Sequence, residues 1–358
     1  MRKIKLDKIA SATRGVSLSR EVTIADEVQA RDGIVIAVRA IGKKTVYNEI
    51  EDPSGRMVLV DEGDVIAGVL GERKALKGYA GRVPAQVRKG DILHLLNLGG
   101  VIGECTSVNM ELGPPRQVEV LGAVQVFPFI GERIGVPADV RTGAVARADS
   151  LPRCAPIVAV AGTCMNSGKT HAASEIVKHL AKKGRRVAAA KLTGVSLKRD
   201  TLSMLDRGAF VALDFADAGA VLTKAGETPA IAKGLLRELD KHNPDVIVVE
   251  LGDGILGEYG VQDILKDPDF RKHLKATIMC ANDPVGAWGA HRLMRDEYQL
   301  EIAVFSGPAT DNAIGRDYIE KNLGVRAVNA RTHDEELALL IAGRLPEPVR
   351  TAPAAGAD

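Results

Sequence analysis

Residues 162–170 read Gly-Thr-Cys-Met-Asn-Ser-Gly-Lys-Thr and combine glycines, a lysine and hydroxyl side chains, which are the residue types of phosphate-binding loops. An apolar run precedes this segment and a helical pattern follows it, so backbone N–H groups of the loop and of a helix N-terminus would point at one anion. In such a loop Lys169 would reach the β- and γ-phosphates of a nucleotide, and the Thr170 hydroxyl would bind Mg²⁺. Five residues separate Gly162 from Gly168, one more than in the standard phosphate loop. The segment predicts a phosphate-binding loop of longer spacing, and the alternative is an ordinary strand-to-helix turn.

Two charged residues end apolar runs elsewhere in the chain. Lys191 closes the run Val-Ala-Ala-Ala, and Glu250 closes the run Val-Ile-Val-Val. A charge at such a place is costly unless a ligand, an opposite charge or solvent compensates it. We expect Lys191 to contact a phosphate or carboxylate of a ligand, with a side chain that reaches solvent as the alternative. We expect Glu250 to lie where Mg²⁺ binds, so Lys169, Lys191 and Glu250 are the candidate catalytic residues.

These candidates fall at the ends of predicted elements in the second half of the chain. Strand patterns occur at 156–161, 186–191, 245–250, 276–280 and 301–305, and helical patterns at about 168–183 and 228–241. Strands that alternate with helices predict a doubly wound, mostly parallel α/β domain over 156–345. Ligands of such sheets bind outside the carboxyl ends of the strands, so the loop, Lys191 and Glu250 should form one site.

The first half of the chain has a different pattern. Short apolar runs bounded by Gly and Pro predict a smaller β-rich domain, a barrel or a sandwich, over 1–130. Gly99 and Gly100 would permit a tight bend or the close approach of another chain, with the bend favoured. The segment 131–155, rich in Gly, Ala, Arg and Pro, is expected to be a linker, and 346–358 a flexible tail.

Composition limits the classes of ligand and the compartment. The 48 basic and 46 acidic residues nearly cancel and aromatic residues make up only 3%, which argues against a nucleic-acid surface and favours a small-molecule substrate. The charged N-terminus lacks the apolar run of a signal peptide, and no long uncharged apolar stretch follows, so we expect a cytoplasmic protein without a membrane segment. The four cysteines form no Cys-x-x-Cys pair, which argues against a disulfide framework or a zinc site.

Three motifs in order carry a resemblance to a known group of enzymes. The loop 162–170 resembles the longer phosphate loop of dethiobiotin synthetase and of the cobyrinic acid a,c-diamide synthases, which are P-loop NTPases. The turn Lys-Leu-Thr-Gly at 191–194 and the segment Glu-Leu-Gly-Asp-Gly at 250–254 match two further motifs of these enzymes, so the resemblance covers about 156–340. It implies ATP and Mg²⁺ as cofactors and a homodimer.

A weaker similarity, carried by 199–209 and 306–312, is to two-domain bacterial P-loop proteins associated with N-acylation of D-amino acids. Residues 1–130 do not resemble the amino-terminal domain of those proteins, so we do not transfer their activity to this chain.

The resemblance also indicates which residues bind the cofactors. The enzymes of this group often have Asp as the third loop residue, where this chain has Cys164, and Asp200, Asp214 or Asp217 could supply the missing carboxylate. Asp200 is favoured, which makes Thr170, Glu250 and Asp200 the candidate metal ligands. The candidate nucleotide-binding residues are Gly162, Thr163, Asn166, Ser167, Gly168, Lys169, Thr170 and His171.

We therefore expect a Mg²⁺-dependent enzyme that uses ATP or GTP to activate a small carboxylate, in the manner of a ligase or synthetase. One alternative is an NTP-driven switch or a chaperone for a metal or cofactor. Another is an acyltransferase whose loop binds the phosphates of CoA.

Overall fold

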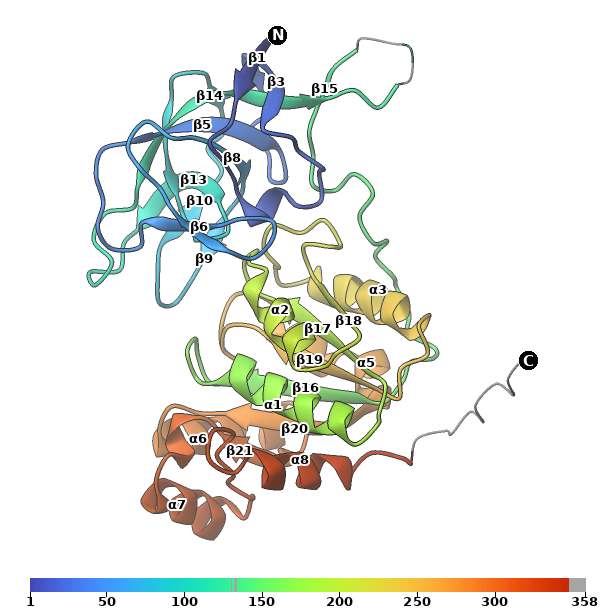
Figure 1. The fold of residues 1–358 in the computed structure, drawn as a ribbon. Coiled ribbons are helices and arrows are strands. Elements are labelled where there is room, and N and C mark those ends of the chain that lie inside the picture. Colours follow the sequence, from blue (N-terminus) through green and yellow to red (C-terminus); the bar gives the residue numbers. More distant parts are fainter. Residues whose placement is uncertain (130, 132–133, 348–358) are drawn as a thin grey trace, which may run out of the picture.

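The computed structural model describes residues 1–129, 131 and 134–347, and it consists of two halves that contact each other end to end (Figure 1). The N-terminal half is built almost entirely from strands, and the C-terminal half is a sheet with helices on both faces (Figure 1). The predicted tail lies outside the described residues from 348 on.

Among its described residues, the N-terminal half contains fifteen strands and a short 3-10 turn, η1 (Ser11–Thr13). The strands are β1 (Arg2–Lys5), β2 (Lys8–Ile9), β3 (Glu21–Ala25), β4 (Glu27–Val28), β5 (Val35–Ile41), β6 (Glu49–Glu51), β7 (Met57–Leu59), β8 (Val65–Leu70), β9 (Arg73–Lys74), β10 (Ala80–Arg82), β11 (Val87–Arg88), β12 (Ile92–Leu95), β13 (Val101–Ser107), β14 (Gln117–Val126) and β15 (Val136–Pro137).

Five of these strands close into a ring. β14 pairs with β5, β5 with β8, β8 with β13, β13 with β12, and β12 again with β14. Alternate residues of β5 enter two apolar clusters on opposite faces, Val35 and Ala37 in one and Ile36 and Val38 in the other. Because both faces of the central strands are covered, their sequences are apolar throughout rather than alternating.

The glycine pair after β12 makes the predicted bend, and the close approach that it allows is by the C-terminal half of the same chain rather than by another chain. Gly100 has a φ of +86°, the left-handed conformation that makes the bend. A Cβ on Gly99 would lie 2.1 Å from the carbonyl oxygen of Ser196, so this glycine also allows the C-terminal half to approach closely.

The C-terminal half contains six parallel strands in the order β18-β17-β19-β16-β20-β21. They are β16 (Ile157–Gly162), β17 (Val187–Thr193), β18 (Val211–Asp214), β19 (Val246–Leu251), β20 (Leu274–Cys280) and β21 (Val304–Ser306). The helices are α1 (Lys169–Lys182), α2 (Arg199–Asp206), α3 (Thr228–Asp240), α4 (Val261–Lys266), α5 (Pro268–His273), α6 (Pro284–Arg292), α7 (Ala313–Leu323) and α8 (Asp334–Ala342), with the short turns η2 (Leu293–Glu297) and η3 (Pro308–Thr310).

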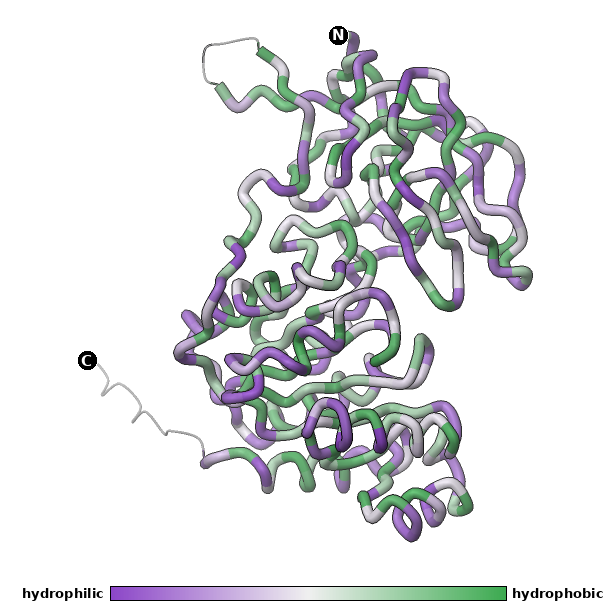
Figure 2. Tube along the Cα trace, turned by 180° about the vertical axis from the view of Figure 1, so that it is seen from behind, coloured by the Kyte–Doolittle hydropathy of each residue, from purple (hydrophilic) through white to green (hydrophobic). Residues whose placement is uncertain are grey.

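The parallel α/β sheet expected from the sequence is therefore present, with two apolar layers. Val158 and Val160 of β16 pack with α1 and α8, whereas Ala159 and Ala161 pack on the other face with α3, α4 and α6. Figure 2 shows hydrophobic strands inside this half and hydrophilic stretches on its helices. The strand β18 was not predicted, because it is a short edge strand whose residues are mostly half-buried.

The segment predicted as a linker is attached to both halves. β15 pairs with β14, and Ala138 is buried in an apolar cluster of the N-terminal half. Further on, the Val145 N–H donates to the Asp217 carbonyl at 2.8 Å, and the Ala148 N–H donates to the Ala230 carbonyl at 2.9 Å. The chain between the halves thus adds hydrogen bonds to the C-terminal half before β16 begins.

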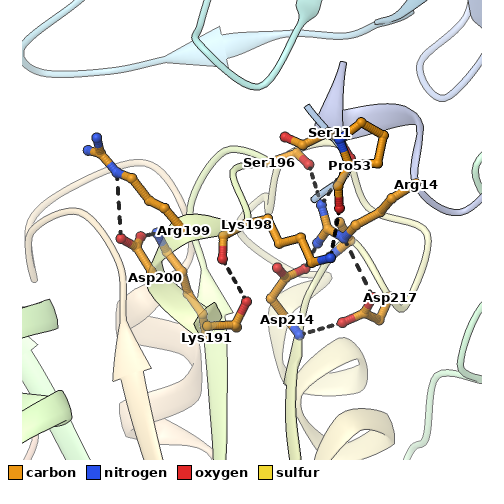
Figure 3. A network of polar contacts seen from close by, with 12 residues as sticks. Ser11, Arg14, Pro53, Lys191, Ser196, Lys198, Arg199, Asp200, Asp214 and Asp217 are labelled. Carbon is orange, nitrogen blue, oxygen red and sulfur yellow. Dashed lines mark hydrogen bonds and ion pairs between the residues drawn. The ribbon is translucent and has the colours of Figure 1, made fainter. Parts of the chain in front are cut away.

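Side chains of the N-terminal half also contact the ends of β17 and β18 directly (Figure 3). Arg14, just after η1, forms ion pairs with Asp214 and, at 3.7 Å, with Asp217. Its guanidinium also donates to the Ser196 hydroxyl at 3.2 Å, and the Asn97 amide donates to the Ser196 carbonyl at 2.8 Å. These contacts fix the N-terminal half over the carboxyl edge of the parallel sheet.

Among the residues that the structure describes, no helix is both long enough and apolar enough to cross a membrane.

Candidate functional site

The predicted phosphate loop connects β16 to α1. Its backbone enters the left-handed region at Asn166 (φ 59°) and again at Gly168 (φ 90°), the residue that immediately precedes α1. The Thr163 N–H donates to the Cys280 carbonyl at 2.9 Å, which ties the start of the loop to the end of β20. A Cβ on Gly162 would lie 2.3 Å from the Ser167 hydroxyl, so the loop can fold back over the end of β16 only with glycine there. The loop therefore has the tight curl and the helix N-terminus that anion binding needs.

Lys169, Thr170 and Glu250 meet beside this loop. Glu250 on β19 is the register partner of Val160 on β16, so its side chain lies next to the first turn of α1. The Thr170 hydroxyl donates to Glu250 Oε1 at 3.0 Å, and the ammonium of Lys169 donates to the Cys164 carbonyl at 2.8 Å. Within the described part of the chain, Glu250 Oε2 is buried without a hydrogen-bond partner.

Burial dominates the charge states of these groups. It lowers the pKa of Lys169, against the attraction of Glu250. It raises the pKa of Glu250, and the nearby Asp200 carboxylate raises it further, while Lys191 and Lys169 act in the opposite direction. The site thus holds cations and carboxylates close together in a region with little solvent.

Lys191 and Asp200 form a buried ion pair at the same edge of the sheet (Figure 3). Lys191 on β17 is the register partner of Glu250, and Asp200 lies in the first turn of α2. Burial opposes the charged form of Lys191, but the carboxylates of Asp200 and Glu250 outweigh it and raise its pKa. The sequence predicted a ligand as the counter-charge of Lys191, whereas in the structure Asp200, the favoured third metal ligand, binds this lysine.

The helix that carries Asp200 is held by the N-terminal half. The buried carboxylate of Glu51 accepts hydrogen bonds of 2.7 Å from the backbone N–H groups of both Lys198 and Arg199. It also accepts one from the Ser11 hydroxyl. Glu51 thus satisfies free N–H groups at the start of α2 and places a negative charge at the favourable end of the helix.

One cavity of about 560 Å³ joins these groups, and both halves of the chain line it. Gly162 and Thr163 do not line it, since they lie at the end of β16 and just after it. The predicted site residues that do line it are Asn166, Ser167, Gly168, Lys169, Thr170, His171, Lys191, Asp200 and Glu250.

Residues for which the sequence predicted no role also line the cavity. Tyr47, Arg73 and Asn97 come from the N-terminal half, and Asp253 and Arg331 come from loops of the C-terminal half. A signal for Asp253 was present, because it lies three residues after Glu250 in a glycine-rich loop. No sequence signal pointed to Arg73, because it lies in a short charged segment whose position depends on the contact between the two halves.

A second group of metal-binding residue types, Glu175, His179 and Asp334, lies on α1 and α8. The ammonium of Lys178 binds both Glu175 and Asp334, the latter at 3.0 Å. A lysine already provides the positive charge here, so this group is a salt-bridge cluster between two helices.

Comparisons with known proteins add little to this geometry. No family model and no curated protein matches the chain. The solved structure of chloroplast FtsY from Physcomitrella patens is 11% identical, with 56% of this chain and 70% of that chain covered at a TM-score of 0.36. FtsY from Mycoplasma mycoides is also 11% identical over the same shares, at a TM-score of 0.38. The hydrogenase maturation factor HypB from Archaeoglobus fulgidus is 12% identical, with 53% of this chain and 89% of that chain covered at a TM-score of 0.35. These scores are too low to carry an argument about this chain.

Proposed function

We propose that this chain is a P-loop enzyme that binds ATP or GTP with Mg²⁺ and transfers the γ-phosphoryl group to a small carboxylate. The observation that carries the proposal is the contact between Thr170 and Glu250 beside Lys169, at the mouth of a curled glycine loop. A hydroxyl, a carboxylate and an ammonium at the N-terminus of one helix match the needs of a phosphate chain and its metal ion.

The residues present fit a magnesium ion. Mg²⁺ prefers oxygen ligands and is commonly held in proteins by one or two carboxylates together with substrate phosphates. The Thr170 hydroxyl and the Glu250 carboxylate offer such oxygens. Among the described residues, Glu250 Oε2 has no hydrogen-bond partner, so it is free to bind a metal ion. When bound, Mg²⁺ would neutralise phosphate charge and orient the phosphate oxygens.

The two lysines have separate roles in this proposal. The ammonium of Lys169 donates to the Cys164 carbonyl in the loop, and rotation of the side chain would bring it to the β- and γ-phosphates. Lys191 keeps its charge because Asp200 and Glu250 lie beside it, and it faces the same cavity. Its ammonium would stabilise charge on the transferring group or on the acceptor carboxylate.

Phosphorylation of a carboxylate gives an acyl phosphate, which an amine can then capture, and neither step requires a protein nucleophile. The volume of about 560 Å³ lies within the range of small-molecule sites, and its second wall, from the N-terminal half, leaves room for an acceptor beyond the phosphates.

The test is equilibrium binding of fluorescent ATP, GTP and CoA analogues to the full chain with Mg²⁺. We expect a nucleotide to bind the parent and Lys169→Ala to weaken that binding at least tenfold. Lys182→Ala, an exposed position at the other end of α1, is the matched control and should bind as the parent does. Unchanged affinity in a folded Lys169→Ala variant would overturn the proposal, and binding of CoA in place of nucleotides would favour the acyltransferase alternative.

A further inference from the structure

The guanidinium of Arg73 on β9 is held by two hydrogen bonds, and its buried Nε is a donor without a partner among the described residues. Only 4% of its surface is exposed, and its Nη1 donates to the Leu96 carbonyl and, at 3.1 Å, to the Tyr47 hydroxyl. The guanidinium carbon lies 5.9 Å from the centre of the Tyr47 ring. A Cβ on Gly78 would lie 2.6 Å from Nη2, so glycine at that position leaves room for the guanidinium. Within the described residues, the buried Nε has no acceptor.

Asp253, in the loop after β19, is a buried carboxylate that no side chain of the described residues donates to. It is 8% exposed, and neither carboxylate oxygen has a hydrogen-bond partner in the described part of the chain. Its backbone is left-handed, with a φ of 69°, which turns the side chain at a sharp bend between Gly252 and Gly254. A Cβ on Gly257 would lie 2.3 Å from Asp253 Oδ2, so this glycine leaves space beside the carboxylate.

The two groups line one cavity, and a hydrogen bond links the segments that carry them. The N–H of Lys74, the residue after Arg73, donates to the side-chain hydroxyl of Tyr259 at 3.1 Å, and this links β9 to the loop after β19 that contains Asp253. Arg73 and Asp253 nevertheless do not form an ion pair with each other in the described part of the chain, and the Asp253 oxygens have no hydrogen-bond partner there. Both side chains are nine-tenths buried, and among the described residues Arg73 Nε and both carboxylate oxygens of Asp253 lack partners, which costs free energy unless a ligand completes their hydrogen bonds.

We infer that Arg73 and Asp253 form a subsite, built from both halves of the chain, that binds a small acid which also carries an N–H or O–H donor. The anionic group of the ligand accepts from the Arg73 guanidinium, and its hydroxyl or amino group donates to the Asp253 carboxylate. The role of this subsite as the acceptor site of a phosphoryl transfer rests on the proposed function. The binding of small acids to the subsite does not depend on that function. The N-terminal half then supplies substrate specificity, and the phosphate loop supplies the reaction.

Matched pairs of small acids test this chemistry, because malate differs from succinate only in a hydroxyl donor, and glutamate differs from glutarate in an ammonium donor with its charge. Malate with succinate, and glutamate with glutarate, are titrated calorimetrically into the full chain saturated with MgADP. We expect malate, glutamate or both to bind at least tenfold more tightly than the partner that lacks the donor, the scale of one hydrogen bond to a charged group.

Substitutions then assign each contact. Arg73→Gln should weaken binding of the acids about tenfold or more, and Asp253→Asn should remove the preference for the member that carries the donor. Arg82→Gln and Asp149→Asn, at exposed positions, are the matched controls and should change neither quantity. Circular dichroism and the affinity for MgADP show whether each variant keeps its fold and its phosphate loop.

The outcomes separate this inference from the proposed function. A parent that binds MgADP but shows no preference for the donor in either pair, or binds none of the four acids, overturns the inference and leaves the phosphate loop standing. A parent that binds no nucleotide but shows the preference, lost in Asp253→Asn, keeps the subsite and overturns the proposed function. A preference that survives in both folded variants also overturns the inference.

Discussion

The carboxylate of Glu51 accepts a 2.7 Å hydrogen bond from the backbone N–H of Arg199, the first residue of α2. The next residue, Asp200, binds the ammonium of Lys191 at the carboxyl edge of the sheet. A residue of the N-terminal half therefore positions the helix whose Asp200 binds Lys191; Figure 3 shows Asp200 beside Lys191.

Glu51→Gln tests this coupling. We expect a loss of about 1–3 kcal/mol in the free energy of unfolding, because an amide NH₂ group would replace a buried acceptor facing backbone donors. Turnover should fall about tenfold while nucleotide affinity stays close to that of the parent, because Lys169 and Thr170 do not depend on α2. Urea unfolding and steady-state kinetics measure the two effects. Glu49→Gln, exposed on the same strand, is the control, and equal losses of turnover in both variants would contradict the coupling.

Lys191→Ala distinguishes an enzyme from a nucleotide-driven switch. We expect nucleotide affinity to stay near the parent's value and turnover to fall by roughly 10²-fold, the scale of one preorganised charge contact in a transition state. Single-turnover phosphate release and equilibrium nucleotide binding give the two numbers. If a folded Lys191→Ala variant retains full turnover with an identified acceptor, the mechanism of carboxylate activation is wrong.

Glu250→Gln should raise the Mg²⁺ concentration needed for half-maximal turnover, because it removes a negative charge from the metal side of the site. The side chain can still accept from the Thr170 hydroxyl through its amide oxygen, so the fold should be retained. A magnesium titration of turnover in the parent and the variant measures the shift. An identical magnesium dependence would show that Glu250 is not a ligand of the metal.

Gly99→Ala tests how closely the halves approach. The added Cβ would lie 2.1 Å from the Ser196 carbonyl oxygen, so the halves must separate locally and we expect a loss of about 1–3 kcal/mol in unfolding free energy. Gly289→Ala, in α6, has no atom within 4 Å of the added carbon and should be neutral or slightly stabilising. Equal stability of the two variants in urea would mean that the contact at Gly99 is not formed.

The sequence predicted the parts of the site that local patterns determine. The loop, Lys191 and Glu250 each follow a run of apolar residues, and the parallel order of the strands brings their ends together. The partner of Lys191 was not predicted, because Asp200 reaches it only when α2 starts at the position that Glu51 sets. The proposed role of Asp200 as a metal ligand stays a prediction.

The position of Arg73 in the cavity could not be predicted from the sequence. Its position in the cavity depends on the contact between two halves that fold from separate stretches of the chain, and no periodicity in either stretch reports that contact. By contrast, Asp253 lies three residues after Glu250, and its acidic side chain in a glycine-rich turn was visible in the sequence but had no assigned partner.

The central claim is that the loop between β16 and α1 binds the phosphates of a nucleotide with Mg²⁺. A crystal structure of the full chain grown with Mg²⁺ and a non-hydrolysable ATP analogue tests it most directly. We expect phosphate density at the backbone N–H groups of residues 163–168, with Lys169 on the phosphates and a metal ion between Thr170 and Glu250. Analogue bound elsewhere on the molecule, with the loop free of phosphate, would contradict it.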